Sequence, residues 1–249
     1  MYVDDHTSFQ PQPAPDATVW RYMDLARYLS LLQNRALHFA RADQMRDRWE
    51  GSYTYQNIKA RPAMYGENYE LMEANRLTAR TQLLQMIHMH CWHLAEAESA
   101  AMWEIYQREG RGVAVRSTWG RLTGSLATDR LVFGGKVRYI DYTKELIPEG
   151  NVFDAFMHKR DSYAHEREAR LVMLTGQPVG EGNDEADSRR MEPEPSVVPV
   201  PVDLSMLVER VYVAPDAPAW IRESVEDLTR TYGFDFEVRQ SDLDSDPIA

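Results

Sequence analysis

The stretch that decides the fold is FDAFMHKRDSYAHEREARLVML, residues 153–174. Its first half predicts a helix, because Phe156, Lys159, Tyr163 and Glu166 recur at helical spacing. Its second half predicts a strand. Apolar residues on both faces of that strand indicate a central, doubly covered position in a sheet. A Glu-x-Glu-x-Arg run lies where the two halves meet.

That run consists of Glu166, Glu168 and Arg170. Strand geometry puts Glu168 and Arg170 on one face at the entrance of the buried strand, where charges are costly unless they are paired or used. Two carboxylates at this spacing suit a ribose hydroxyl or an oxocarbenium-like centre, and arginine suits phosphate. The alternative is an internal ion-pair network in which Arg170 neutralises Glu168.

The composition is that of a soluble globular protein. Of 249 residues, 43% are hydrophobic and 27% are charged, and no apolar run approaches the roughly 20 residues of a membrane span. The acidic, proline-rich N-terminus lacks the features of a signal peptide, and the single cysteine, Cys91, excludes an internal disulfide. These features favour the cytoplasm.

The net charge of −11 disfavours extended nucleic-acid binding, because phosphate contacts need clustered lysine and arginine. A local basic pocket is compatible with this charge.

The remaining sequence predicts one α+β domain over residues 19–243, with a mixed, largely antiparallel sheet flanked by helices. Residues 1–18 are expected to be a flexible lead-in, residues 176–194 an acidic surface loop, and residues 244–249 a tail. The strands are expected over residues 18–23, 36–42, 88–94, 112–118, 131–141, 197–202, 208–213 and 234–239. The other helices are expected over residues 24–34, 68–87, 96–108 and 217–232, with residues 43–66 irregular.

Several polar residues on these elements are candidates for a binding site. Arg21 and Arg41 lie in predicted strands and suit bidentate phosphate or carboxylate binding, or they pair with acidic side chains. Arg116, Ser117 and Thr118 end another strand, where they line a pocket or cap the next helix.

Glu98 and Trp103 belong to a predicted helix and are further candidates for a pocket, although Trp103 also fits a core position. His88, His90, Cys91 and His93 match no standard zinc spacing, so we interpret them as packing residues and predict no metal site there.

Asp43, Asp47 and Glu50 are the carboxylates that a metal-dependent nuclease would use. The arginines among them favour a self-paired loop instead. The sequence contains no P-loop, G-x-G-x-x-G, G-x-S-x-G or H-E-x-x-H motif, which removes the simplest nucleotide-triphosphatase, Rossmann, serine-hydrolase and zincin readings.

With these segments in view, the chain resembles a broad bacterial family known only as a domain of unknown function. The resemblance covers about residues 20–243 and rests on WRYMDLARYLSLLQNRALHFARAD, CWHLAEAESAAMW, GVAVRST, GKVRYIDY, HKRDSYAHEREARLVM and VPVDLSMLVERVYVAP. This resemblance implies no activity.

The order of Arg-bearing, Ser-Thr-bearing and Glu-bearing strands is also similar to the ADP-ribosyltransferase superfamily. In that superfamily these groups surround NAD. The resemblance implies that Arg21 binds the pyrophosphate, that Ser117 and Thr118 support the nicotinamide ribose, and that Glu168 is the catalytic carboxylate, with Glu166 beside it.

The sequence thus predicts an ADP-ribosyltransferase-like or NAD-hydrolysing enzyme, with NAD as substrate and no permanently bound cofactor. The resemblance implies a macromolecular acceptor, a toxin or phage-defence role, and a possible cognate partner or regulator. The alternatives are the metal-dependent nuclease and a non-catalytic sensing or partner-binding module with Trp103, Arg116 and Arg170 around its pocket. In the enzyme reading, Arg41, Arg116, Tyr163, Arg170, Glu98 and Trp103 join the substrate-binding candidates.

Overall fold

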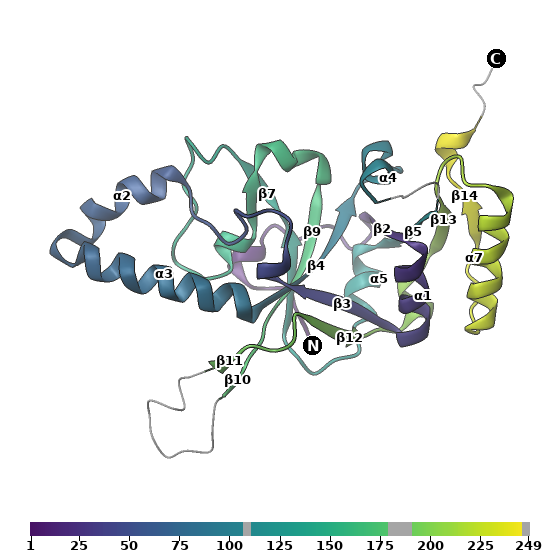
Figure 1. Cartoon of the computed structure of the whole chain (residues 1–249), viewed down its shortest axis with the longest axis horizontal. Coiled ribbons are helices and arrows are strands. Elements are labelled where there is room, and N and C mark those ends of the chain that lie inside the picture. The colour runs from purple at the N-terminus through teal and green to yellow at the C-terminus, as the bar shows by residue number, and fades with distance from the viewer. Residues whose placement is uncertain (107–110, 179–190, 246–249) are drawn as a thin grey trace.

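A mixed sheet forms the centre of the computed structural model, which describes residues 1–106, 111–178 and 191–245. Its main path runs β1-β6-β9-β4-β2-β5-β13-β14, with β3 beside β4 and β12 beside β3 (Figure 1). Most neighbours are antiparallel, so the predicted α+β class is confirmed. The strands are β1 Tyr2–Val3, β2 Thr18–Asp24, β3 Ala36–Arg41, β4 Ile87–Leu94, β5 Gly112–Thr118, β6 Val132–Lys136, β9 Glu168–Leu174, β12 Val197–Pro201, β13 Arg210–Val213 and β14 Val238–Gln240.

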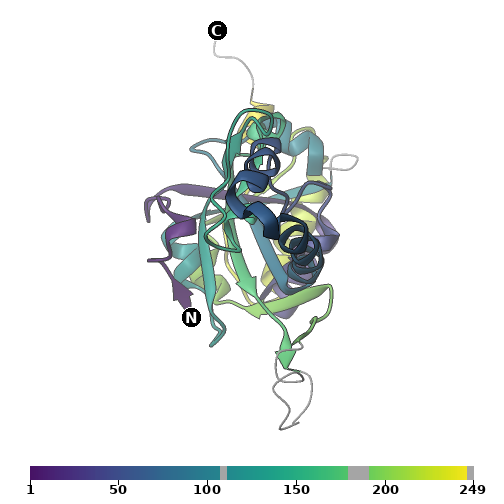
Figure 2. The ribbon, with the colours of Figure 1, turned by 90° about the vertical axis from the view of Figure 1, so that its left-hand side faces the viewer.

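Helices cover the sheet at one end and extend from it at the other. The α2–α3 pair projects away from the sheet, while α1 and α7 lie at the opposite end (Figure 1); Figure 2 views the molecule from the side of α2 and α3. The helices are α1 Leu25–Asn34, α2 Tyr55–Tyr65, α3 Tyr69–Met86, α4 Ala100–Tyr106, α5 Trp119–Gly124, α6 Leu204–Leu207 and α7 Ala219–Thr231. Two further strand pairs are β7 Arg138–Ile140 with β8 His158–Arg160, and β10 Gln177–Pro178 with β11 Met191–Glu192.

Strand β9 is central, as its apolar pattern predicts. It pairs with β4 on one side and β6 on the other. Ala169, Leu171 and Met173 belong to the larger hydrophobic core, and Val172 belongs to a second core on the opposite face. The charged Glu168 and Arg170 share the face of Val172, so they are carried into the interior by the strand itself.

The segment before β9 is not the predicted helix. It forms a 3₁₀ turn at Asp154–Phe156, then β8, then a second 3₁₀ segment at Asp161–Glu166. The parallel pairing of β8 with β7 supplies backbone hydrogen bonds that a helix would otherwise make, and it buries Lys159. Tertiary pairing therefore overrides the helical spacing of this segment.

Two other expectations fail for local reasons. Within residues 43–66, predicted to be irregular, α2 forms behind a capping box in which Thr54 and Asn57 satisfy each other's backbone N–H groups. The single strand predicted over residues 131–141 is two strands, β6 and β7, because the chain changes partner between them. The Val137 N–H still donates to the Glu168 carbonyl oxygen of β9 at 2.9 Å, whereas the Arg138 N–H donates to the Met157 carbonyl oxygen beside β8 at 2.9 Å.

The N-terminal segment, predicted as a lead-in, pairs with the sheet and packs against it in the structure. Tyr2–Val3 pairs in parallel with β6, and Gln12 donates from Nε2 to the Gly134 carbonyl oxygen at 2.6 Å. Phe9 is only 1% exposed because its ring packs against Phe133 and Phe153. Residues 179–190 of the predicted acidic loop and residues 246–249 of the predicted tail lie outside the described residues.

Across the described ranges, none of the helices has both the length and the apolar character that crossing a membrane requires.

We expect Phe9→Ala to lower the free energy of unfolding by about 3–5 kcal/mol, because it removes a buried ring from a packed aromatic cluster. Urea unfolding followed by circular dichroism measures this change. Trp220→Ala is the control, since Trp220 is 55% exposed on α7. An equal, small effect of both substitutions would contradict the tight packing of the N-terminal segment.

Candidate functional site

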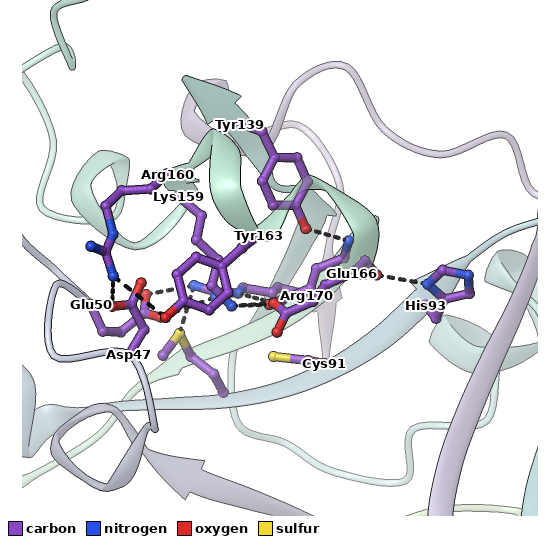
Figure 3. A network of polar contacts seen from close by, with 12 residues as sticks. Asp47, Glu50, Cys91, His93, Tyr139, Lys159, Arg160, Tyr163, Glu166 and Arg170 are labelled. Atoms are coloured by element: carbon purple, nitrogen blue, oxygen red, sulfur yellow. Dashed lines mark hydrogen bonds and ion pairs between the residues drawn. The ribbon is translucent and has the colours of Figure 1, made fainter. Parts of the chain in front are cut away.

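The Glu168 carboxylate is held between two cations at the start of β9. Figure 3 labels residues around it, among them Lys159, Glu166 and Arg170. Its Oε2 accepts from Arg170 Nε at 2.6 Å, and its Oε1 accepts from Lys159 Nζ at 2.7 Å. The backbone N–H of Glu168 donates to the Tyr139 hydroxyl at 2.8 Å. Glu168 is 8% exposed, so these contacts fix both its position and its ionised state.

Arg170 is the anchor of this cluster and is 1% exposed. Its guanidinium forms a bidentate pair with Glu50, Nη1 to Oε1 at 2.6 Å and Nη2 to Oε2 at 3.0 Å. Nη1 also donates to the Phe156 carbonyl oxygen at 2.6 Å. One buried arginine thus joins β9 to the segment before α2 and to the turn before β8.

Lys159, on β8, connects Glu168 to Glu166. Its ammonium donates to both carboxylates and lies 4.6 Å from the centroid of the Tyr163 ring. The backbone carbonyl of Glu166 is within hydrogen-bond distance of His93 Nδ1, at 2.7 Å. With Glu50, the cluster contains three carboxylates and two cations. This imbalance favours the binding of one proton by a carboxylate of the cluster.

The pKa values of the two neighbouring glutamates are shifted in opposite directions. Burial acts to raise the pKa of Glu168, but Arg170 and Lys159 outweigh it and hold that pKa well below its usual range. For Glu166, burial and then the nearby Glu168 raise the pKa to about 7. Near neutral pH, therefore, Glu168 stays ionised while Glu166 can accept or release a proton.

Both glutamates line a cavity of about 590 Å³, which we call the Glu168 cavity. Its other charged and aromatic walls come from the end of β2, α1, the segment before α2, α4, β8, the 3₁₀ segment after β8, and β9. They are Asp24, Arg27, Arg46, Asp47, Glu50, Tyr106, Lys159, Tyr163, His165 and Arg170. The volume lies in the range of small-molecule sites.

A much smaller neighbouring cavity includes Arg21. A small cavity of about 30 Å³ is lined by Arg21, Tyr106, Glu166 and Glu168, and it shares these glutamates with the Glu168 cavity. Arg21 donates from Nη1 to the Cys91 carbonyl oxygen at 2.7 Å. The structure therefore brings Arg21, Glu166, Glu168, Tyr163 and Arg170 together.

The Cys91 side chain also lines both cavities. Burial and then the charge of Glu168 raise the pKa of its thiol to about 12. The thiol is consequently protonated at neutral pH and is unsuited to act as a nucleophile.

Other predicted site residues have different partners. Arg116 forms an ion pair with Glu209, and the Ser117 hydroxyl donates to the Leu207 carbonyl oxygen. Thr118 caps α5 by accepting from the Arg121 N–H at 3.3 Å. None of Arg116, Ser117 and Thr118 is among the residues that line the Glu168 cavity.

Arg41, Glu98 and Trp103 are likewise used elsewhere. Arg41 pairs with Asp43 at 2.9 Å. Trp103 is buried in a core cluster and donates from Nε1 to Glu98 at 2.8 Å. The Glu98 carboxylate also accepts from the Ser241 hydroxyl at 2.6 Å, and this bond holds the C-terminal segment in place.

The carboxylates of the acidic loop are separated by their partners. Asp43 pairs with Arg41, Asp47 pairs with Arg160 at 2.8 Å, and Glu50 pairs with Arg170. Within the ranges that the structure describes, no three His, Cys, Asp or Glu side chains are grouped so that they could hold a metal ion.

Sequence reasoning missed the roles of Glu50 and Lys159. The sequence predicts Glu50 as a metal ligand or as part of a self-paired loop, and Lys159 as one position on a helical face. The one available signal was the charge count, because the Glu-x-Glu-x-Arg run has an excess of carboxylates that calls for a further cation.

Comparisons with known proteins give little sequence similarity. No protein-family model matches this chain, and no curated protein matches it. Solved structures of DarT from Thermus sp. 2.9 are similar to it at low scores. The complex with NAD+ has a TM-score of 0.42 and 7% identity over 92% of this chain and 96% of that chain. The complex with carba-NAD+ has a TM-score of 0.40 and 8% identity over 92% of this chain and 96% of that chain. The complex with ADP-ribosylated ssDNA has a TM-score of 0.40 and 8% identity over 93% of this chain and 97% of that chain. The resemblance to a bacterial domain family stays a prediction, and the geometry of the site must carry the functional argument.

We expect Arg170→Met to lower the free energy of unfolding by about 3–5 kcal/mol, because it leaves Glu50 and Glu168 without their shared guanidinium in the interior. Arg239→Met is the matched control, since its pair with Glu237 is exposed and is worth no more than about 1 kcal/mol. Chemical denaturation of both variants measures the difference. Equal unfolding midpoints would show that the buried pairs do not hold this part of the fold.

Proposed function

We propose that this protein is an ADP-ribosyltransferase-like enzyme that cleaves the bond between nicotinamide and ribose in NAD. The observation that carries the proposal is the pair Glu166 and Glu168, two carboxylates of opposite pKa shift in one cavity. Pairs of this kind divide the work of glycosidic chemistry between a permanent negative charge and a proton carrier.

In the proposed reaction, the bond between the ribose C1′ and the nicotinamide nitrogen breaks, and its electron pair leaves with nicotinamide. The positive charge that develops on the ribose is stabilised by the Glu168 carboxylate, which its contacts with Arg170 and Lys159 hold in place. An acceptor hydroxyl, or water, then attacks C1′ and gives its proton to Glu166.

The remaining residues of the cavity have supporting roles in the proposal. Arg21, which lines the small cavity beside Glu168, is available to the pyrophosphate. The rings of Tyr106 and Tyr163 offer flat surfaces to the nicotinamide or the ribose. The macromolecular acceptor, and with it a toxin or phage-defence role, rests on the resemblance of the sequence to the superfamily.

We expect Glu168→Gln to reduce NAD consumption by purified protein by about 10²–10³-fold, because the amide cannot supply the negative charge that stabilises the ribosyl cation. Release of nicotinamide, followed by chromatography, measures the reaction. Glu209→Gln is the matched control, since Glu209 pairs with Arg116 outside the Glu168 cavity and should leave the rate unchanged.

Further outcomes separate the competing functions. Unfolding of Glu168→Gln would favour a structural ion pair. Cleavage of nucleic acid that a chelator abolishes would favour the metal-dependent nuclease. Absence of both NAD turnover and an NAD-induced thermal shift in the unmodified protein would refute the proposal.

We expect the kcat/KM for NAD to rise with pH through about 7 and then level off, because Glu166 must be ionised to accept a proton and its pKa is raised to about 7. Glu166→Gln should lower the plateau and remove this limb from the pH profile. Initial rates between pH 5 and pH 9 test the point. A profile with the same limb in Glu166→Gln would assign the proton transfer to another group.

A further inference from the structure

Helix α3 is incompletely covered by the rest of the chain. It belongs to the pair of helices that projects from the sheet (Figure 1), and none of its 18 residues is buried. Met72, Ala79 and Leu83 share one face of this helix, because they recur at positions i, i+7 and i+11. All three line a cavity of about 320 Å³, which we call the Arg80 cavity. Its volume is at the lower end of the range for small-molecule sites.

The opposite wall of the Arg80 cavity comes from two loops. One is the segment before α2, which contributes Gly51 and Tyr53, and the other is the segment of residues 149–156. The apolar side chains of Met72 and Val152 face each other across this division of the walls only in part, since the two residues are 39% and 40% exposed. A ligand that covers them removes apolar surface from water, so the cavity favours a ligand with an apolar body.

Arg80 contributes a guanidinium to the cavity, and two of its three nitrogens are already used. Its Nη2 donates to the Glu50 carbonyl oxygen at 3.1 Å and to the Ser52 hydroxyl at 2.9 Å. Its Nε donates to the Gly51 carbonyl oxygen at 3.3 Å. Toward the described residues Nη1 makes no hydrogen bond, and it retains accessible surface, unlike the enclosed Nε of Arg76. One nitrogen of Arg80 is therefore open to a ligand.

The charges around the cavity leave Arg80 without a counterion. Arg76 and Glu149 also line the cavity, but they pair with each other at 2.8 Å. Among the described residues, no carboxylate forms an ion pair with Arg80, and Asp154 of the neighbouring loop does not line the cavity. A partly buried guanidinium without a counterion favours an anion. One charge with one open nitrogen suits a carboxylate better than a doubly charged phosphate.

We propose that the Arg80 cavity binds a small monocarboxylate with an apolar body, with the carboxylate at Arg80 and the apolar part against Met72, Leu83 and Val152. In the part of the chain that the structure describes, no residue lines both this cavity and the Glu168 cavity. The inference therefore does not depend on cleavage of NAD.

Calorimetric titration of the full chain with octanoate tests this site. Ala79→Trp adds a large side chain at the cavity without removing Arg80, and it should abolish octanoate binding. Ala74→Trp is the matched control, because Ala74 is also exposed on α3 but does not line the cavity, and it should bind octanoate like the unmodified protein. No saturable binding by the unmodified protein, or equal binding by both variants, would overturn the proposal.

Further arms test each half of the ligand. Octanol lacks the carboxylate and acetate lacks the apolar body, so each should bind the unmodified protein at least about tenfold more weakly than octanoate. Equal binding of either one would overturn the assignment of an apolar carboxylate. Tighter binding of octyl phosphate than of octanoate would overturn it as well, in favour of a phosphate ester.

The role of Arg80 is tested separately from its contacts with the loop. Arg80→Gln should weaken octanoate binding by about tenfold and leave the affinity for octanol within about twofold, because only octanoate carries the charge that the guanidinium recognises. An equal loss of affinity for both ligands would mean that Arg80 only maintains the shape of the cavity, and it would contradict recognition of the carboxylate by this residue.

Discussion

The bidentate pair between Arg170 and Glu50 is the interaction on which the site depends. It joins residues 120 positions apart in the sequence, and both side chains are almost completely buried. Desolvating an arginine and a carboxylate is costly, and only nearly ideal hydrogen bonding offsets that cost. Because Arg170 also holds Glu168 and the Phe156 carbonyl, one guanidinium orders β9, the turn before β8 and the loop before α2 at once.

The balance of carboxylates and cations in this cluster determines which carboxylate can carry a proton. Glu50, Glu166 and Glu168 face Arg170 and Lys159, so the charge balance of the cluster favours one bound proton. Only Glu168 contacts both cations, whereas burial raises the pKa of Glu50 and raises that of Glu166 to about 7. Of these last two carboxylates, Glu166 is the more exposed. The structural ion pairs and the functional reading are therefore compatible, because the pairs keep Glu168 charged and leave Glu166 free to titrate.

Features set by residues close together in the sequence, such as strand alternation and helix caps, could be predicted from the sequence. The alternation from Ala169 to Leu174 predicted that β9 is central. Asp24 predicted the start of α1, where its carboxylate accepts a hydrogen bond from the Arg27 N–H at 2.8 Å. The partners of Arg170 could not be predicted, since Glu50 comes from a loop whose path is set by long-range packing. The segment over residues 153–166 was mistaken for a helix because its charged side chains follow helical spacing while its backbone pairs with β7.

The divergence of β2 from β4 explains why cavities lie on both faces of the sheet. These strands pair at Val19–Leu94 and Trp20–His93, whereas the ladder between β2 and β5 runs on to Asp24–Gly112. Beyond Trp20, it is the Arg21 side chain that reaches β4, at the Cys91 carbonyl oxygen. Arg21 thus bridges a gap in the sheet and lines cavities on both sides of it, so its charge acts on both. An uninterrupted ladder would have placed backbone hydrogen bonds where the site now has a guanidinium.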